Sequence, residues 1–80
     1  MKTLRELVAG VLDIKPQNLD DKSSPENIES WDSFNGLMLV SELEKNFKVK
    51  FSMDEVMAVK NYADIKKALK SHGVVEGVDN

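Results

Sequence analysis

The feature that most restricts the fold is the spacing of the apolar residues, which recur every three or four positions along most of the chain. This spacing puts them on one face of a helix, whereas a half-buried strand would alternate with a period of two. The first such segment, residues 3–13, has apolar residues at Leu4, Leu7, Val8, Val11 and Leu12. The second, residues 33–47, has them at Phe34, Leu37, Val40, Leu43 and Phe47. No two-residue alternation persists, so we predict an all-α fold in which these faces pack together.

Each of the four helices that we predict begins at a residue able to cap it. These residues are Thr3, Asp32 or Ser33, Ser52 and Asn61. Thr3 and Ser52 are each followed three residues later by Glu, which is the spacing of a capping box. The third helix is short, and we expect Met53 and Met57 to fill the core from it, as flexible methionines often do. The apolar residues of the fourth helix, which we expect to end at Gly73, are Tyr62, Ile65, Ala68 and Leu69.

A long connection separates the first two helices, because Pro16 disfavours helical backbone beyond Ile14. Loops as long as residues 15–32 are usually functional or held down by side chains. The anchors that we expect are Leu19, Ile28 and Trp31. Residues 20–32 contain five acids and one Lys, a net charge of −4. The predicted architecture is therefore a four-helix bundle with three longer helices, one short helix and a long acidic loop between the first and second.

The length and composition restrict the class of protein. Eighty residues suffice for a single domain, 1–80, in which we expect residues 74–80 to be a disordered tail. The net charge of −3 argues against nucleic-acid partners, which require clustered Lys and Arg. The chain has no Cys for disulfides or thiolate ligands, no apolar run long enough to span a membrane, and no signal-peptide pattern. We expect a stand-alone cytoplasmic protein that does not insert into membranes.

The sequence offers little for catalysis. It has no Gly-rich phosphate loop and no metal-spaced His/Cys cluster. His72 is the one histidine and lies near a helix C-terminus, where a cation is favourable. A pair between His72 and Ser33 would require a geometry that the sequence alone does not define. The acids of residues 20–32 are typical of a solvated surface. We therefore expect no metal site, no catalytic residues and no enzymatic activity of the chain by itself.

Ser33 is the strongest candidate for a functional residue. Its hydroxyl follows the long loop and stands at the start of the second helix. The simplest interpretation is that Asp32 or Ser33 caps this helix. A helix N-terminus also stabilises an attached phosphate, and Asp32 can help to hold a divalent cation during phosphoryl transfer. Ser33 is thus suited to capping, to phosphorylation or to a phosphodiester.

At this point the chain resembles the acyl carrier proteins, whose attachment signature Asp-Ser-Leu opens their second helix. Here the signature reads Asp32-Ser33-Phe34. The likeness also covers Val11-Leu12 before a Pro-bearing turn, Trp31, Leu39-Val40, Leu43-Glu44, Phe47, and Phe51 ahead of the third helix. It implies that Ser33, supported by Asp32, bears 4′-phosphopantetheine taken from coenzyme A by a holo-carrier-protein synthase with Mg²⁺. The thiol of this arm would hold acyl groups as thioesters for fatty-acid, polyketide or specialised-lipid enzymes.

The resemblance also suggests how partners bind to a monomeric carrier. The partner-binding candidates are Phe34, Met38, Glu42 and Glu44. We expect Phe34 on the core or pocket side, and Met38 on the flank or exposed face, where fatty-acid members often have Glu. Those members have an acidic second helix, whereas residues 32–50 here have no net charge. Two alternatives stay open: an aminoacyl or peptidyl carrier of the same fold, and a helical interaction module in which Ser33 is a cap or a phosphosite.

Overall fold

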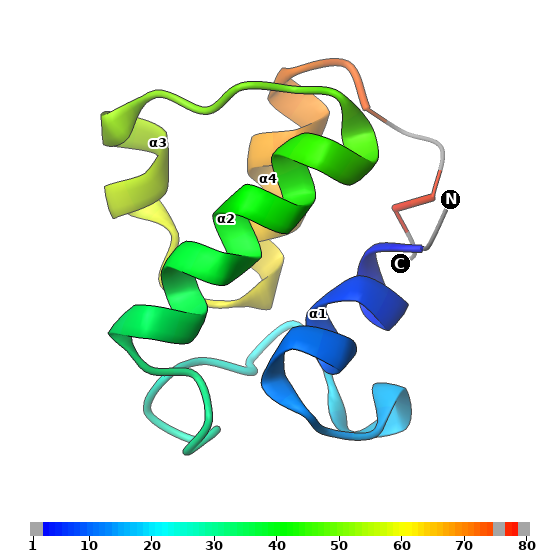
Figure 1. Cartoon of the computed structure of the whole chain (residues 1–80), viewed down its shortest axis with the longest axis vertical. Coiled ribbons are helices and arrows are strands. Elements are labelled where there is room, and N and C mark those ends of the chain that lie inside the picture. Colours follow the sequence, from blue (N-terminus) through cyan, green and yellow to red (C-terminus); the bar gives the residue numbers. More distant parts are fainter. Residues whose placement is uncertain (1–2, 75–76, 79–80) are drawn as a thin grey trace.

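A computed structural model describes residues 3–74 and 77–78, and these residues form helices and no strand. The elements are α1 (Leu4–Leu12), the 3-10 turn η1 (Pro16–Asn18), α2 (Ser33–Phe47), α3 (Met53–Ala58) and α4 (Tyr62–Ser71). The all-α prediction is confirmed, with three longer helices, one short helix and a long connection between α1 and α2 (Figure 1). None of these helices has the length and apolarity that crossing a bilayer requires.

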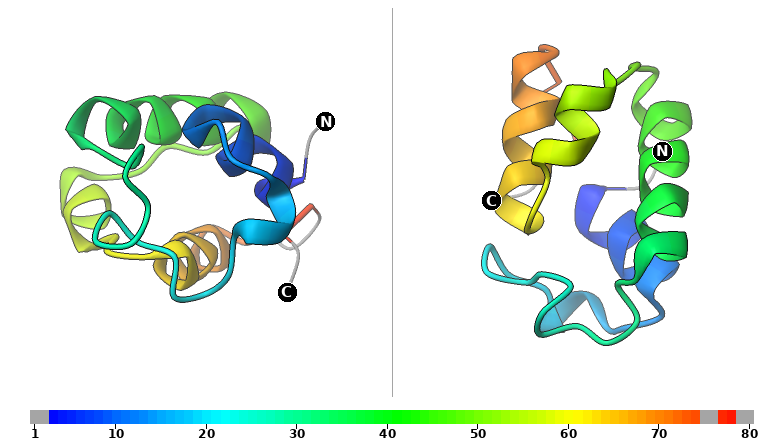
Figure 2. Two further views of the ribbon diagram at one scale, coloured as in Figure 1. Left: turned by 90° about the horizontal axis from the view of Figure 1, so that it is seen from below. Right: turned by 90° about the vertical axis from the view of Figure 1, so that its left-hand side faces the viewer.

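The helices surround one core. Figure 2 shows α3 and α4 beside one another on the side opposite α2, while the connection after α1 runs across one end of the bundle. The core residues are Leu4, Leu7, Val8 and Leu12 of α1, Leu39, Leu43 and Phe47 of α2, Tyr62, Ile65 and Leu69 of α4, and Leu19 and Trp31 of the connection. No residue of α3 is fully buried, so α3 covers the core rather than forming it.

The caps follow the sequence prediction. The Thr3 and Ser52 side chains both form capping boxes, with Glu6 and Glu55 respectively. The Asn61 side chain accepts the Asp64 N–H at 2.9 Å and caps α4. These local bonds satisfy N–H groups that the first turn of a helix otherwise leaves unpaired.

The face that α2 buries differs from the predicted one. Phe34 and Leu37 were expected on the core side, but they are 70% and 67% exposed. The buried stripe is Leu39, Leu43 and Phe47. Residues 37–40 are all apolar, so two different stripes satisfy helical periodicity, and packing against α1 and α4 selects the one containing Leu39.

The prediction that Met53 and Met57 fill the core is also wrong, because each is 72% exposed. These two residues lie four positions apart and share one face of the six-residue α3. Val56 and Val59, both half-buried, are the residues of this region that turn inward. The methionines therefore form an exposed apolar face on α3.

The described part of the C-terminal segment is packed. Val74 and Val78 lie against the core, and the Leu4 N–H donates to the Gly77 carbonyl at 2.7 Å. For residues 74, 77 and 78 the expectation of a disordered tail is wrong, because the valines bury apolar surface and Gly77 pairs with an N–H of the first turn of α1. Residues 75–76 and 79–80 lie outside the described residues.

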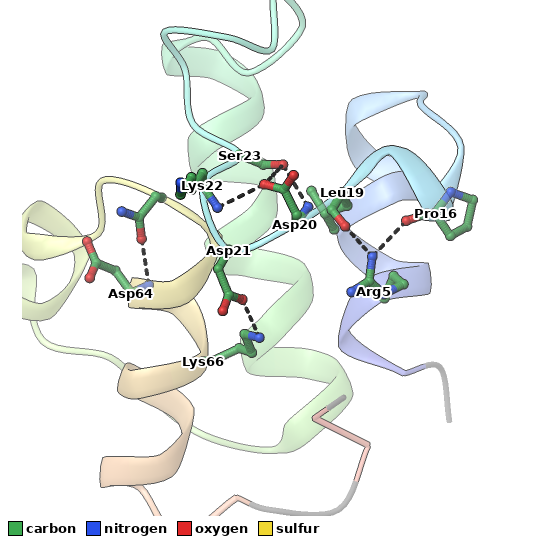
Figure 3. A network of polar contacts seen from close by, with 10 residues as sticks. Arg5, Pro16, Leu19, Asp20, Asp21, Lys22, Ser23, Asp64 and Lys66 are labelled. Carbon is green, nitrogen blue, oxygen red and sulfur yellow. Dashed lines mark hydrogen bonds and ion pairs between the residues drawn. The ribbon is translucent and has the colours of Figure 1, made fainter. Parts of the chain in front are cut away.

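The long connection is held by side chains as well as by its buried anchors. Leu19 and Trp31 are buried and Ile28 is half-buried against the core, as predicted. Figure 3 shows the Arg5 guanidinium donating to the carbonyls of Pro16 and Leu19, and Lys66 of α4 paired with Asp21. The Tyr62 N–H donates to the Ser23 carbonyl at 2.9 Å. The connection is thus fixed to both α1 and α4, and its path to the start of α2 is defined.

Candidate functional site

Ser33 is the first residue of α2 and is exposed. The cap of this helix is Asp32, whose Oδ1 accepts the Asn35 N–H at 2.9 Å. The Ser33 hydroxyl makes no hydrogen bond to any other described residue. The interpretation in which Ser33 itself caps the helix is therefore wrong, and its hydroxyl is left free for chemistry at a fixed corner of the fold.

The corner is fixed by what lies just before it. Trp31 is 6% exposed and its side chain packs in the core. Its backbone N–H donates to the Ile28 carbonyl at 3.0 Å. A large buried aromatic side chain two residues from Ser33 restricts how far the backbone can move. The sequence thus places a buried anchor, a capping carboxylate and an exposed hydroxyl in succession.

An apolar pocket opens beside Ser33. Its volume is about 210 Å³ and it lies between α2, α3 and α4. The lining residues are Trp31, Ser33, Gly36, Leu37, Leu39, Val40, Leu43, Phe51, Glu55, Val56, Val59, Ile65 and Ala68. The pocket is suited to an apolar ligand, since Glu55 is the one charged residue among these described lining residues.

Glu55 links α3 to the end of α4. Its carboxylate accepts the Ser52 N–H at 2.9 Å and lies 2.8 Å from Nε2 of His72. The backbone N–H of Ser52 lowers the pKa of Glu55 below its ordinary value; desolvation opposes this shift, and the His72 side chain adds to it. The His72 ring also meets Phe51 edge-on, with centroids 5.2 Å apart. These contacts give His72 a structural setting at the end of α4.

The partner-binding candidates lie in different environments. Phe34 and Met38 are exposed, Met38 at 41%. Glu42 lies 3.7 Å from Lys45 on the helix surface. Glu44 accepts the Phe51 N–H at 2.9 Å and so holds the chain that follows α2. Glu44 is thus engaged within the fold, whereas the other three face outward to different extents.

Sequence reasoning missed three exposed apolar residues in this region: Leu37, Met53 and Met57. Together with Phe34 and Met38 they are the exposed large apolar residues of α2 and α3, and we call this set the apolar face. One signal was available, since a run of four apolar residues at 37–40 cannot be buried entirely by one helix face. Among the described residues, no group of three or more His, Cys, Asp or Glu side chains is arranged to hold a metal ion.

Residues 2–69 match the family described as "phosphopantetheine attachment site". The chain belongs to this family. It is therefore a carrier protein rather than an enzyme, and its cofactor is covalently bound 4′-phosphopantetheine.

A solved structure supports the same assignment of fold. This carrier is similar to the holo acyl carrier protein from Geobacter metallireducens, determined by NMR in solution, with a TM-score of 0.77 and 28% identity. The match covers 89% of this chain and 85% of that chain. No curated protein matches the sequence. The carrier thus has the all-helical fold of the acyl carrier proteins.

Proposed function

We propose that Ser33 is the residue to which 4′-phosphopantetheine is attached, and that the chain presents acyl groups as thioesters on this arm. The observation that carries the proposal is the exposed Ser33 hydroxyl at the start of α2, unused by the fold and beside an apolar pocket. Ser23, by contrast, is buried, and the Ser30 hydroxyl donates to the Leu12 carbonyl at 2.6 Å. The surroundings of Ser33 fit the cofactor because a helix N-terminus stabilises an attached phosphate.

The attachment is a phosphoryl transfer in which Ser33 is the nucleophile. Its Oγ bonds to the pantetheine-side phosphorus of coenzyme A, and the bond from this phosphorus to the bridging pyrophosphate oxygen breaks. The hydroxyl proton passes to a base of the synthase, and adenosine 3′,5′-bisphosphate leaves. Mg²⁺ would neutralise the pyrophosphate charge, with Asp32 beside it in support. The bound group supplies the thiol that this chain, without Cys, lacks.

The pocket favours acyl cargo over aminoacyl cargo. A dry cavity of about 150 Å³ holds benzene, so the 210 Å³ here accommodates roughly eight carbons. An aminoacyl group would bring an ammonium group, for which the described lining offers only the Glu55 carboxylate, already bonded to Ser52 and His72. Burying an ammonium group without a free partner is costly. The pocket therefore supports acyl intermediates of fatty-acid, polyketide or specialised-lipid synthesis as the cargo. We propose in addition that the carrier acts as a monomer in the cytoplasm.

The partners that we propose are a holo-carrier-protein synthase followed by acyl-transfer and synthase enzymes. We propose that they dock on the apolar face, in which Phe34 and Met38 lie on α2 close to Ser33. Large apolar side chains that are exposed near one another commonly mark interaction sites. Glu42 can add a charged contact at its edge, while Glu44 acts by holding Phe51.

The experiment is incubation with coenzyme A, Mg²⁺ and a promiscuous phosphopantetheinyl transferase, followed by intact-mass measurement. Wild type should gain one phosphopantetheinyl group, and Ser33→Ala should gain none. A wild-type chain that stays unmodified, or a Ser33→Ala chain that is modified, would reject Ser33 as the site. Addition of phosphate alone by cellular kinases would instead support the interaction-module alternative.

A further inference from the structure

Ser30 connects the end of α1 to the beginning of α2. Its hydroxyl donates to the Leu12 carbonyl, the last of α1, at 2.6 Å. Its carbonyl accepts the Asn35 side-chain amide at 2.7 Å and the Asp32 N–H at 3.0 Å. The relay from Leu12 through Ser30 to Asn35 therefore joins two helices that meet at the corner carrying Ser33.

The relay surrounds Ser33 without touching it. Asn35 lies two residues after Ser33 and holds Ser30, three residues before it. The Asn35 N–H also donates to the Asp32 carboxylate, and the Gly36 N–H to the Asp32 carbonyl at 2.8 Å. The segment 30–36 is thus closed by hydrogen bonds at both ends, and the exposed Ser33 lies within the turn that these bonds hold.

We propose that Ser30 and Asn35 are positioning residues for phosphopantetheine transfer to Ser33. This inference rests on the proposed function. The Ser33 oxygen must approach phosphorus within about 3–3.5 Å in the site of another protein, and small misplacements reduce the rate steeply. A fixed corner keeps the hydroxyl oriented toward phosphorus once the carrier is bound, so that less conformational freedom has to be lost to reach the transition state and kcat is higher.

The amide of Asn35 is essential to this role because it is a donor. A carboxylate at position 35 would have two acceptor oxygens facing the Ser30 carbonyl and could not make the bond. Asn35→Asp is therefore a nearly isosteric test that removes the relay, whereas Ser30→Thr keeps a hydroxyl for the Leu12 carbonyl. Ser41, an exposed serine elsewhere on α2, gives a matched control as Ser41→Ala.

The first measurement is the kinetics of modification by a phosphopantetheinyl transferase with coenzyme A and Mg²⁺, on variants shown to be folded. Asn35→Asp, Asn35→Ala and Ser30→Ala should each lower kcat about tenfold with little change in KM, the size expected for one lost hydrogen bond. Ser30→Thr should restore most of the rate, and Ser41→Ala should match wild type. Ser30 and Asn35 belong to the same series of hydrogen bonds, so breaking the series at either residue should have the full effect. The double Ala variant should therefore be about as slow as either single variant.

The second measurement is amide hydrogen exchange, which needs no modification of Ser33. In Asn35→Asp, Asn35→Ala and Ser30→Ala, the backbone amides at positions 35 and 36 should lose protection from exchange. The backbone amides of Leu43 and Phe47 should keep their protection. Unchanged kcat, or an effect on KM alone, would overturn the positioning role, as would unchanged exchange at Asn35 and Gly36. If wild type itself is not modified, the proposed function fails, and exchange still decides whether the relay fixes the corner.

Discussion

At the residue scale, two neighbouring polar side chains at the start of α2 have separate roles. Asp32 caps the helix through the Asn35 N–H, and Ser33 makes no contact that the fold requires. Capping statistics do not distinguish these residues, because Asp and Ser are both favoured at this position. The side-chain geometry distinguishes them, and it leaves the hydroxyl available.

This division predicts different stabilities for two variants. Ser33→Ala should change the free energy of unfolding by less than about 0.5 kcal/mol, as for surface sites without contacts. Asp32→Ala should cost about 1 kcal/mol, because it removes the cap. Urea denaturation of both variants measures this directly. A Ser33→Ala protein as destabilised as Asp32→Ala would mean that Ser33 contributes to the fold.

At the element scale, the first turn of α2 carries the candidate site, and the C-terminal part of the helix contributes to the core. Phe47 is 8% exposed near its C-terminal end, whereas Phe34 is 70% exposed in its first turn. The same residue type therefore has opposite roles in one helix. This contrast follows from the buried stripe that begins at Leu39.

The two phenylalanines give a matched test of that stripe. Phe47→Ala should cost about 3–5 kcal/mol, through lost burial and the cavity it leaves. Phe34→Ala should change stability by less than about 0.5 kcal/mol. Equal losses of stability, measured by thermal or denaturant unfolding, would mean that α2 packs on the stripe containing Phe34.

The contact between α3 and α4 predicts a pH dependence. The pKa of Glu55 is lowered from 4.5, chiefly by the Ser52 N–H, with His72 contributing. A carboxylate with a depressed folded-state pKa stabilises the fold above its unfolded value and loses this contribution as the pH falls through its folded value. Glu55→Gln should therefore be less stable than wild type above about pH 4.5, and the difference should shrink as the solution is acidified below it.

Unfolding midpoints between pH 2 and 7 would measure this effect, with Glu26→Gln as a control at an exposed position of the long connection. A difference between wild type and Glu55→Gln that stays constant through the acid range would contradict the assignment.

The helices and their caps could be predicted from the sequence because capping is local. Thr3 and Ser52 need only a Glu three residues later, and both boxes form. The buried face of α2 could not be predicted, because the four consecutive apolar residues 37–40 point to every side of the helix. Packing against the rest of the core determines which of them are buried. The exposure of Met53 and Met57 depends on which side of a short helix faces the core. Ser33 could be predicted as a candidate site from its position after a long loop and at the start of a helix. The hydrogen bond between Asn35 and the Ser30 carbonyl could not be predicted, because it depends on how the loop folds back on α2.

At the scale of the whole molecule, charge and apolar surface lie in different places. Residues 20–32 carry a net charge of −4, more than the −3 of the entire chain, whereas residues 32–50 are balanced. Two of the acids, Asp20 and Asp21, are bonded within the connection or to Lys66. Only the electrostatic steering that remains should therefore come from the connection, and most of the affinity should come from short-range contacts of the apolar face.

This distribution predicts weak salt dependence of docking on α2. Electrostatic steering mainly raises association rates and fades as salt screens it, whereas burial of apolar groups such as Met38 is less sensitive. Met38→Glu should improve recognition by fatty-acid synthase enzymes that favour acidic helices and impair recognition by the carrier's own partners. Association rates measured across salt concentrations for both proteins would test this. A steep loss of the cognate rate with salt, or indifference to Met38→Glu, would contradict it.

Fragment-ion mapping of the modified protein tests most directly whether this carrier bears its cofactor on Ser33. Ser30 provides an internal comparison three residues away, because its hydroxyl is bonded to Leu12. After incubation with coenzyme A, Mg²⁺ and a transferase, the phosphopantetheinyl group should be found on Ser33 and on no other serine. A group located on Ser30 or any other residue, or no added group, would contradict the account.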